Sequence, residues 1–414
     1  YHHNSRAVFF RFHTIFSFLW MVAGLAVAGR RFGRSSSSSS LYSRRQQLSY
    51  YCCCWWFTIL HHHHTTGSRR YAVAAMSSTT TTTKAAIAQL RSTSDKLSNL
   101  RHVALCAGWA KREGASMLFL PECFGFMGVS SDQTLEQAEP PIDGDDSHNK
   151  NEPKVAELLK QTVEMAAEQE DHPNKEEEDP ACSSSSTTTT TINTISLLDG
   201  LQTIACASNL WISAGGMHTL GAPPRPDDDN GKPRVYNTHL ILDNKGKVQC
   251  FYHKMHLFDV SIPNQVNLKE SNTTAPGTDM VVCESPIGTL GLTTCYDVRF
   301  PEMYVKLVQE KGAQILLVPS AFTVPTGRAH WHMLLRARAI ENQCYVLAAA
   351  QYGEHNEKRT SYGHSLAVNP WGEILADAGG YDSSSSSSEV EVAAAITPPS
   401  IVTCEIDLEY LTLI

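Results

Sequence analysis

The stretch Gly291-Leu-Thr-Thr-Cys295-Tyr-Asp-Val-Arg-Phe-Pro-Glu302 decides the fold, because it joins a strand pattern to a helix pattern. The residues around its start, Gly288 to Thr294, are small, apolar or β-branched and predict a buried strand. Pro301 suits the first turn of a helix, and Gly312 suits the end of that helix. The pattern therefore places Cys295 at a turn between a strand and a helix.

A cysteine just before a helix start lies where backbone N–H groups and the positive end of the helix dipole converge. This environment favours a thiolate and can hold an oxyanion, and both are properties of a catalytic nucleophile's site. A buried structural thiol is the competing interpretation, since unpaired cysteine is among the most buried residue types. The turn by itself leaves both roles of Cys295 open.

Composition excludes several classes of protein. The 12 cysteines are scattered apart from Cys52-Cys53-Cys54 and form no Cys-x-x-Cys pair, so neither a disulfide scaffold nor a zinc site is indicated and a reducing compartment fits best. Residues 1–94 carry eleven Lys or Arg and no Asp or Glu. Because the net charge of the whole chain is −8, residues 95–414 are strongly acidic, and they give no support for nucleic-acid binding. The run His61 to His64 is interpreted as incidental low-complexity sequence, although adjacent histidines chelate metals.

Residues 1–83 are expected to be a low-complexity, targeting-like and disordered extension. Within them, Ile15 to Gly29 is an apolar run that is too short to span a bilayer comfortably and resembles a secretory signal. The Ser-, Arg- and Thr-rich blocks that follow resemble an organelle transit peptide. Because the chain begins with Tyr1, initiation at Met21 or Met76 stays open, and with it a mitochondrial, plastid or cytoplasmic location.

The folded part is predicted to run from residue 84 to residue 414 as a single α/β domain. Strands are predicted at 85–90, 117–120, 210–215, 235–242, 248–252, 315–319, 345–350, 362–368, 373–376 and 402–406, and helices at 95–112, 154–169, 194–207 and 330–343. A loop is predicted at 320–329. Acidic, Pro-containing or Ser/Thr-rich segments near 141–153, 170–192 and 381–398 are expected to be insertions into this domain.

Three of the predicted strands end beside a chemically active side chain: Glu122, Lys254 and Cys295. Strand ends of a layered sheet converge, so these groups are expected to meet, although Glu122 taken alone also fits a solvated turn. Together they suit the cleavage of an amide. The thiol would attack the carbonyl, the carboxylate would take its proton and later activate water, and the ammonium would stabilise the oxyanion with the backbone N–H of Tyr296.

The motifs resemble the nitrilase or carbon–nitrogen hydrolase superfamily, whose signature is a Glu-Lys-Cys triad. They are Phe119-Leu-Pro-Glu122, Tyr252-His-Lys254-Met-His-Leu-Phe-Asp259 and Thr294-Cys295-Tyr-Asp-Val-Arg-Phe-Pro-Glu302, in the family's order. The resemblance implies a four-layer α-β-β-α sandwich and a reaction that needs no cofactor. It also implies that Glu270, the counterpart of the family's second glutamate, is a catalytic residue that lies near the lysine and helps to position the substrate or relays a proton.

Within the superfamily, the chain is most similar to the deaminated glutathione amidases. The similarity rests on Ser320-Ala-Phe, Thr326 to Trp331, Leu335 to Glu341, Ala348 to His355 and Arg359 to Ser365. It implies that a thioester acyl-enzyme forms and that the amide between a 2-oxoglutarate unit and Cys-Gly is hydrolysed. It further implies a homodimer or higher homo-oligomer paired through helices, including the one after Cys295.

Tyr296, Thr326, His330 and Trp331 are candidates for substrate binding, because they lie beside the cysteine or in and after the predicted loop. Packing at the helix start is the structural alternative for His330 and Trp331. Two other functions stay open. The first is an ω-amidase or nitrilase with a small amide or nitrile substrate, and the second is a catalytically silent interaction module with the acidic insertions as docking tails. A metal ion, a nucleic-acid partner and a stable membrane span are not expected.

Overall fold

Parallel strands form the centre of the largest sheet among the described residues of the structure, which is a computed structural model. The structure describes residues 82–142, 151–168, 195–225, 231–262, 266–381 and 399–413. The predicted extension, apart from residues 82 and 83, lies outside the described residues, as do the greater parts of the three predicted insertions.

The larger sheet has eight strands among the described residues, in the order β13-β12-β1-β2-β3-β4-β5, with β16 paired to β1. Strands β1, β2 and β3 run parallel, and β1 and β2 are apolar and buried, as strands with both faces covered must be. The strands are β1 (Thr83–Leu90), β2 (Met117–Leu120), β3 (Trp211–Ala222), β4 (Arg234–Leu242), β5 (Val248–His253), β12 (Ala350–Asn356), β13 (Arg359–Tyr362) and β16 (Ser400–Ile406).

The second sheet has six strands in the described part of the chain, in the order β15-β14-β11-β10-β9-β8, with β9, β10 and β11 parallel. They are β8 (Val282–Ser285), β9 (Gly288–Leu292), β10 (Ile315–Leu317), β11 (Tyr345–Ala348), β14 (Leu366–Val368) and β15 (Ile374–Asp377). A separate hairpin pairs β6 (Asp259–Ile262) with β7 (Val266–Lys269).

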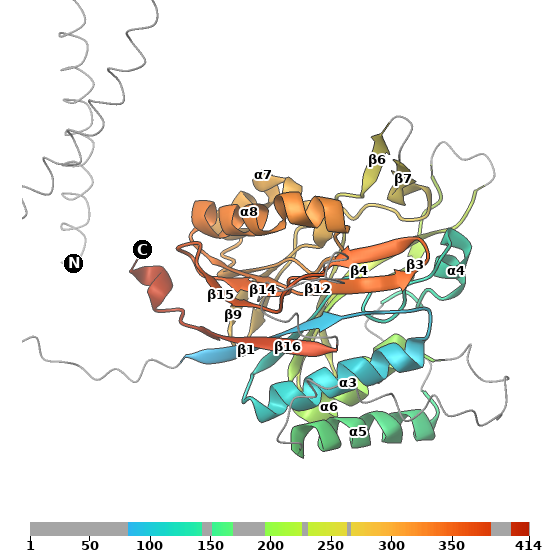
Figure 1. Ribbon diagram of the computed structural model, residues 1–414, viewed down its shortest axis with the longest axis horizontal. Helices are drawn as coiled ribbons and strands as arrows, with labels where there is room; N and C mark the ends of the chain where they lie inside the picture. Colours follow the sequence, from blue (N-terminus) through green and yellow to red (C-terminus); the bar gives the residue numbers. More distant parts are fainter. Residues whose placement is uncertain are drawn as a thin grey trace, which may run out of the picture. The chain divides into compact units, whose positions relative to one another are not determined.

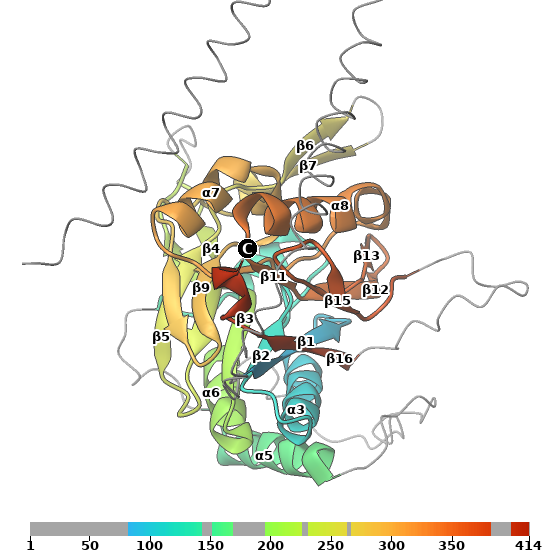
Figure 2. The same cartoon turned by 90° about the vertical axis from the view of Figure 1, so that its left-hand side faces the viewer.

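Helices cover the outer face of each sheet, which gives the predicted four-layer α-β-β-α sandwich (Figures 1 and 2). On the larger sheet lie α3 (Lys96–Arg112), α5 (Pro153–Glu168) and α6 (Leu197–Ser208), and on the smaller sheet lie α7 (Pro301–Gln309) and α8 (Val324–Asn342). The short α4 (Ser131–Glu136) follows β2. None of the helices in the described segments combines the length and the apolar character that crossing a membrane requires.

Alternation along β1 distributes its side chains between two cores. Ala85 and Ile87 belong to the core between the sheets, whereas Ala86, Ala88 and Leu90 belong to the core under α3, α5 and α6. Successive side chains of a strand point to opposite faces, so one short apolar run supplies both layers.

Two contacts join the sheets near their strand ends. A Cβ atom at Gly215 would lie 2.1 Å from the Cβ of Pro319 and 2.2 Å from the carbonyl oxygen of Leu120, so only glycine permits this approach. The buried imidazole of His239 lies 2.7 Å from the hydroxyl of Ser213 and 3.0 Å from the carbonyl oxygen of Thr293. Residues of the larger sheet are thereby fixed against the segments that follow β9 and β10.

The structure corrects several predicted boundaries. The helix predicted at 330–343 begins at Val324, so the prediction of a loop at 320–329 is wrong from that residue onward. Pro325 is in its first turn, where a missing N–H has no cost. Strand β3 runs to Ala222 rather than ending at 215, and it passes a register shift between Gly215 and Met217. The elements α4, β6, β7, β8 and β13 were not predicted.

Candidate active site

Four side chains that the sequence analysis singled out lie together where the strands of both sheets end. The Nζ atom of Lys254 is 2.9 Å from Oε1 of Glu122 and 3.0 Å from Oε2 of Glu270. The thiol of Cys295 lies close enough to the Glu122 carboxylate and the Lys254 ammonium for both charges to act on it. Glu122, Lys254 and Cys295 are only 5%, 2% and 9% exposed, so the cluster is shielded from bulk water.

Glu122 is held by donors from both sheets. It follows β2 and Pro121, and its Oε1 accepts a hydrogen bond of 2.9 Å from Nδ2 of Asn237 on β4. Its Oε2 accepts one of 3.1 Å from the backbone N–H of Ala321, which follows β10. The buried amide of Gln351 donates to the Glu122 carbonyl oxygen at 3.0 Å. These contacts fix both the backbone and the carboxylate.

Lys254 directly follows β5, and its backbone N–H donates to the carbonyl oxygen of Asn237. Its ammonium bridges two carboxylates, because Glu270 lies opposite Glu122 at the end of the β6–β7 hairpin. Glu270 also accepts a bond of 2.7 Å from the backbone N–H of Phe258. A buried ammonium with two anionic partners is positioned without needing water.

Cys295 opens a 3-10 helix, Cys295–Arg299, in a left-handed backbone conformation with φ of 50°. Non-glycine residues rarely adopt this conformation, and such strain persists where surrounding contacts enforce it. Here the backbone N–H of Cys295 donates to the carbonyl oxygen of Pro319 at 2.9 Å. The turn therefore holds the sulfur beside Glu122.

Asp297 joins the cysteine turn to the segment around the lysine. Its buried carboxylate accepts hydrogen bonds from the Tyr252 hydroxyl at 2.7 Å and from the backbone N–H of Thr294 at 2.9 Å. It also accepts from the backbone N–H and from Nδ1 of His256, at 2.9 and 2.7 Å. Tyr252 and His256 flank Lys254 on both sides, so one carboxylate positions both the nucleophile and the ammonium.

Burial and charge set the protonation states of the cluster. Burial alone would lower the pKa of Lys254, but the carboxylates of Glu122 and Glu270 outweigh it and hold that pKa well above its ordinary value. Burial alone would raise the pKa of Glu122, but the Lys254 charge and the donated hydrogen bonds lower it. Burial and the charge of Glu122 raise the pKa of Cys295 well above its ordinary value, against the effect of Lys254. The resting cluster is carboxylate, ammonium and neutral thiol.

The neutral thiol corrects the expectation that the turn favours a thiolate. The helix that begins at Cys295 is a 3-10 helix of five residues, so its dipole is small. Burial and the neighbouring Glu122 carboxylate both disfavour a second anion, and together they outweigh the ammonium of Lys254.

The predicted substrate-binding residues lie in different surroundings. Thr326 lies in the first turn of α8, with its hydroxyl 2.8 Å from that of Thr323. Trp331 is buried, packs against Phe322 and donates its indole N–H to the carbonyl oxygen of His364 at 2.8 Å. We therefore leave Thr326 and Trp331 out of the proposed substrate site.

Tyr296 and His330 both adjoin the guanidinium of Arg299, which follows Cys295 by four residues. The guanidinium of Arg299 lies over the rings of Tyr296 and Phe322, at 5.8 and 5.7 Å from their centres. Its Nη2 is 3.3 Å from Nδ1 of His330, whose side chain is exposed. The Tyr296 ring also meets Phe258 edge-on. An arginine framed by aromatic rings thus lies four residues after the thiol.

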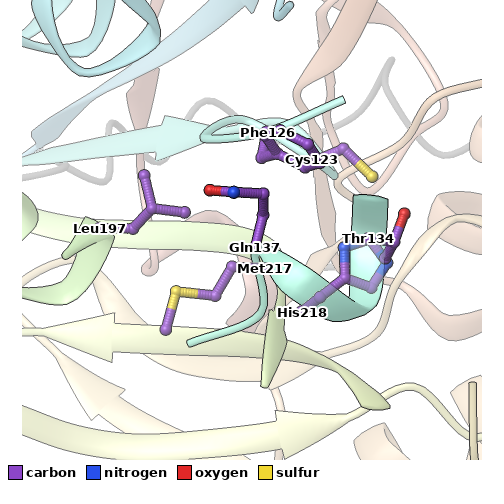
Figure 3. A pocket seen from close by; sticks show the side chains of 7 residues that line it. All are labelled: Cys123, Phe126, Thr134, Gln137, Leu197, Met217 and His218. Carbon is purple, nitrogen blue, oxygen red and sulfur yellow. The ribbon is translucent and has the colours of Figure 1, made fainter. Parts of the chain in front are cut away.

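A small cavity lies beside Cys123, the residue that follows Glu122 (Figure 3). It is lined by Cys123, Phe126, Thr134, Gln137, Leu197, Met217 and His218 and has a volume of about 10 Å³. That volume admits about one water molecule, so a substrate does not fit. Burial lowers the pKa of His218 to about 4, so its imidazole is neutral there.

Sequence reasoning gave no role to Asn237, Ala321 or Asp297. Asn237 has no distinct signal, because the residues that follow it in β4, Thr238 and His239, are polar too. Asp297 lies in the stretch that carries the cysteine, but its partners are distant in sequence. The backbone N–H of Ala321 has no signal, since only the meeting of the two sheets brings it to Glu122.

A four-layer sandwich with a Glu-Lys-Cys cluster at its strand ends defines the nitrilase class of proteins. The chain belongs to the carbon–nitrogen hydrolase family, which matches residues 84–412.

Several similar proteins are named deaminated glutathione amidase or NitFhit. The chain is 53% identical to the deaminated glutathione amidase of Dictyostelium discoideum, over 44% of this chain and 60% of that protein. It is 39% identical to the human protein of the same name, over 70% of this chain and 72% of that one. It is 38% identical to the nitrilase and fragile histidine triad fusion protein NitFhit of Drosophila melanogaster, over 74% of this chain and 53% of that protein. The matches thus span less than two thirds of the Dictyostelium and Drosophila proteins.

Two crystal structures share the architecture. The NitFhit protein of Caenorhabditis elegans matches with a TM-score of 0.56 and 34% identity, over 80% of this chain and 62% of that one. Saccharomyces cerevisiae Nit3, a member of branch 10 of the nitrilase superfamily, matches with a TM-score of 0.55 and 26% identity, over 80% of this chain and 92% of that one.

Proposed function

We propose that this chain is a cysteine-dependent amidase that hydrolyses deaminated glutathione to 2-oxoglutarate and Cys-Gly. The observation that carries the proposal is the buried cluster in which the Cys295 thiol feels the charge of the Glu122 carboxylate, and that carboxylate is paired with the Lys254 ammonium at 2.9 Å. A nucleophile already paired with its base is the arrangement that acyl transfer requires. The choice of substrate rests on the names of the similar proteins.

In the proposed first half-reaction, the sulfur of Cys295 bonds to the amide carbonyl carbon while Glu122 takes the thiol proton. The oxyanion that forms is stabilised by Lys254 and by the backbone N–H of Tyr296. Collapse of this intermediate breaks the C–N bond, and Glu122 passes its proton to the departing amine of Cys-Gly. The 2-oxoglutaryl group remains on the sulfur as a thioester.

The second half-reaction reverses the roles of base and acid. Glu122 takes a proton from water, and the hydroxide formed attacks the thioester carbonyl under the same oxyanion stabilisation. Collapse breaks the C–S bond, and the sulfur recovers its proton from Glu122. Glu270 has no part in the proton transfers, and its proposed role is to position the Lys254 ammonium, which it contacts at 3.0 Å.

The shifted pKa values suit this mechanism. The pKa of Glu122 is lowered and that of Cys295 is raised, so proton transfer between them is unfavourable until the sulfur bonds to carbon. The thiol is therefore held neutral in the empty site and becomes a nucleophile only against a bound carbonyl.

Arg299 supports an anionic substrate. A guanidinium recognises a carboxylate through charge and paired hydrogen bonds, and this one lies beside the aromatic ring of Tyr296 next to the nucleophile. Deaminated glutathione carries the carboxylate of its 2-oxo acid end, whereas a simple nitrile has no such group. The same cation also fits 2-oxoglutaramate, the substrate of the ω-amidase alternative.

A substrate panel tests the assignment. We expect kcat/KM for deaminated glutathione to exceed that for 2-oxoglutaramate by at least about tenfold, since binding of the Cys-Gly part adds to transition-state stabilisation. A larger value for 2-oxoglutaramate would make the protein an ω-amidase, and a larger value for a nitrile would make it a nitrilase. A catalytically silent module would turn over none of them and would show no hyperreactive Cys295 on thiol labelling.

We also propose that the chain forms homo-oligomers through α8. Met333 and Ile340 on this helix are 77% and 51% exposed, and the neighbouring Trp371 is 68% exposed. Ile340 packs beside Gly372, so the three side chains belong to one region of the surface. Exposed apolar patches of this kind are typical of subunit interfaces.

A further inference from the structure

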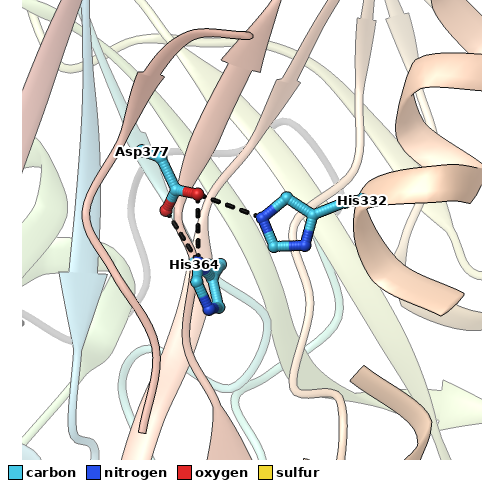
Figure 4. Close-up of side chains that lie close together, drawn as sticks. All are labelled: His332, His364 and Asp377. Atoms are coloured by element: carbon cyan, nitrogen blue, oxygen red, sulfur yellow. Dashed lines mark hydrogen bonds and ion pairs between the residues drawn. The ribbon is translucent and has the colours of Figure 1, made fainter. Parts of the chain in front are cut away.

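His332, His364 and Asp377 converge at the surface, and none of them belongs to the Glu-Lys-Cys cluster (Figure 4). Nε2 of His332 lies 3.0 Å from Oδ2 of Asp377, and Nδ1 of His364 lies 2.9 Å from Oδ1. The three potential ligand atoms lie within 4.8 Å of one another. We propose that these residues bind one divalent transition-metal ion of the zinc class.

The three residues come from three different elements. His332 lies on α8, His364 lies between β13 and β14, and Asp377 ends β15. Asp377 is paired directly with Leu366 across the β14–β15 ladder, two residues beyond His364. A constellation built on a helix and a paired hairpin is held more firmly than one built on a single loop.

The backbone around His364 fixes the direction of its ring. The residue has φ of 60°, its N–H donates to the carbonyl oxygen of Gly379, and its own carbonyl oxygen accepts from Trp331. A Cβ atom at position 380 would lie 2.1 Å from Nε2 of His364, so Gly380 makes room for the ring. Nδ1 is thereby directed at Asp377, as Figure 4 shows.

Two imidazoles and one carboxylate form a ligand set that zinc, cobalt and nickel accept. Metal–ligand bonds of about 2.0–2.2 Å place neighbouring ligand atoms roughly 3 Å apart. The two histidine–carboxylate separations already have this length, so only the two imidazoles need to move closer to each other. All three side chains are partly exposed, which leaves room for water to complete the coordination.

The carboxylate is ready to bind a cation. Burial alone would raise the pKa of Asp377, but hydrogen bonds from His332 and His364 outweigh it and hold that pKa well below its usual range. The other ionisable groups near this site are the phenol of Tyr362 and the guanidinium of Arg328.

An ion at this site would join α8 to the β14–β15 hairpin. The residue next to His332 is Trp331, which packs on Phe322 of the segment that leads from β10 into α8. Binding to the folded state alone raises the melting temperature, which gives the proposal a readout that is independent of turnover.

The experiment uses the full chain with His61 to His64 changed to Gln in every sample, because that run can chelate metals by itself. Metal is first removed with EDTA, and Co²⁺ is then titrated while the visible absorption bands are recorded. We expect one Co²⁺ per chain. His332→Gln and Asp377→Asn should each weaken binding by at least about tenfold, as loss of a ligand does. His330→Gln, an exposed histidine two positions earlier on α8, is the matched control and should bind as the parent does.

The outcomes are decisive in each case. Zn²⁺ should raise the melting temperature of the parent and of His330→Gln, but not that of His332→Gln. Binding that His332→Gln leaves unchanged, or intense sulfur-to-cobalt absorption in the near ultraviolet, would place the ion elsewhere and overturn the proposal. So would a parent protein that binds Co²⁺ no better than the variants. If Asp377→Asn fails to fold, the exposed substitution at His332 still decides the question.

Discussion

Changing Asp297 to Asn tests whether one buried carboxylate holds the candidate active site together. This side chain accepts hydrogen bonds from Tyr252, from Thr294 and twice from His256. Asparagine offers one acceptor oxygen instead of two, and its NH₂ group would face donors. With two bonds lost at about 1.5–3 kcal/mol each, as is usual for a charged acceptor, unfolding should become easier by about 3–6 kcal/mol.

Urea unfolding measures this change in free energy, from the midpoint and the slope of the transition. Tyr252→Phe is the control that keeps the buried ring. It removes one of the bonds to Asp297 and also the acceptor of the Met255 backbone N–H, so its cost should be about 2–4.5 kcal/mol. The kcat of Asp297→Asn should also fall more than about tenfold, since a small misplacement of reacting groups is costly.

Two results would refute this reasoning. An Asp297→Asn protein within about 1 kcal/mol of the parent would show that the carboxylate is not the anchor that its four contacts indicate. A Tyr252→Phe protein as unstable as Asp297→Asn would show that the cost comes from the loss of the hydroxyl alone.

Four further expectations concern the site and the surface. Glu122→Gln should lower kcat/KM by about 10²–10⁴-fold with an unchanged circular dichroism spectrum, and near-normal turnover would exclude this base. Glu122 acts as a base in its deprotonated form and its pKa is lowered, whereas Lys254 acts in its protonated form and its pKa is raised. The value of kcat/KM should therefore stay constant across neutral pH. A change of kcat/KM with pH near 7 would count against both roles. Gly215→Ala should cost about 3 kcal/mol in urea unfolding, because its Cβ meets backbone and Pro319, and a neutral effect would contradict the close approach. Met333→Glu should dissociate the oligomer in sedimentation experiments, whereas Met165→Glu on α5, which is also exposed, should not.

The long periodic elements could be predicted from the sequence. Strand β1, helix α3 and strand β2 have clear apolar patterns, and Asp95 caps α3 as its position indicates. Short strands such as β8 carry too few residues to show a period. The start of α8 was missed because Gly327 is typical of a loop. In the structure this glycine is inside the helix, where a Cβ atom would lie 2.3 Å from the Tyr362 ring.

The residues of the candidate site were also accessible to sequence reasoning, but their electrostatics were not. Motif order indicated Glu122, Lys254, Glu270 and Cys295. The neutral state of the thiol depends on burial and on the distance to a carboxylate far away in the chain, and neither can be read from local pattern. The same holds for the support that Asn237 gives to Glu122.

The most direct test of the account is the turnover of deaminated glutathione by full-length Cys295→Ala beside the parent enzyme. The substituted protein should keep its fold, because the change removes a single heavy atom from a buried side chain. We expect its release of Cys-Gly to be undetectable above the uncatalysed rate. Release at the parent rate would mean that the amide is broken without this thiol, and the mechanism would have to be abandoned.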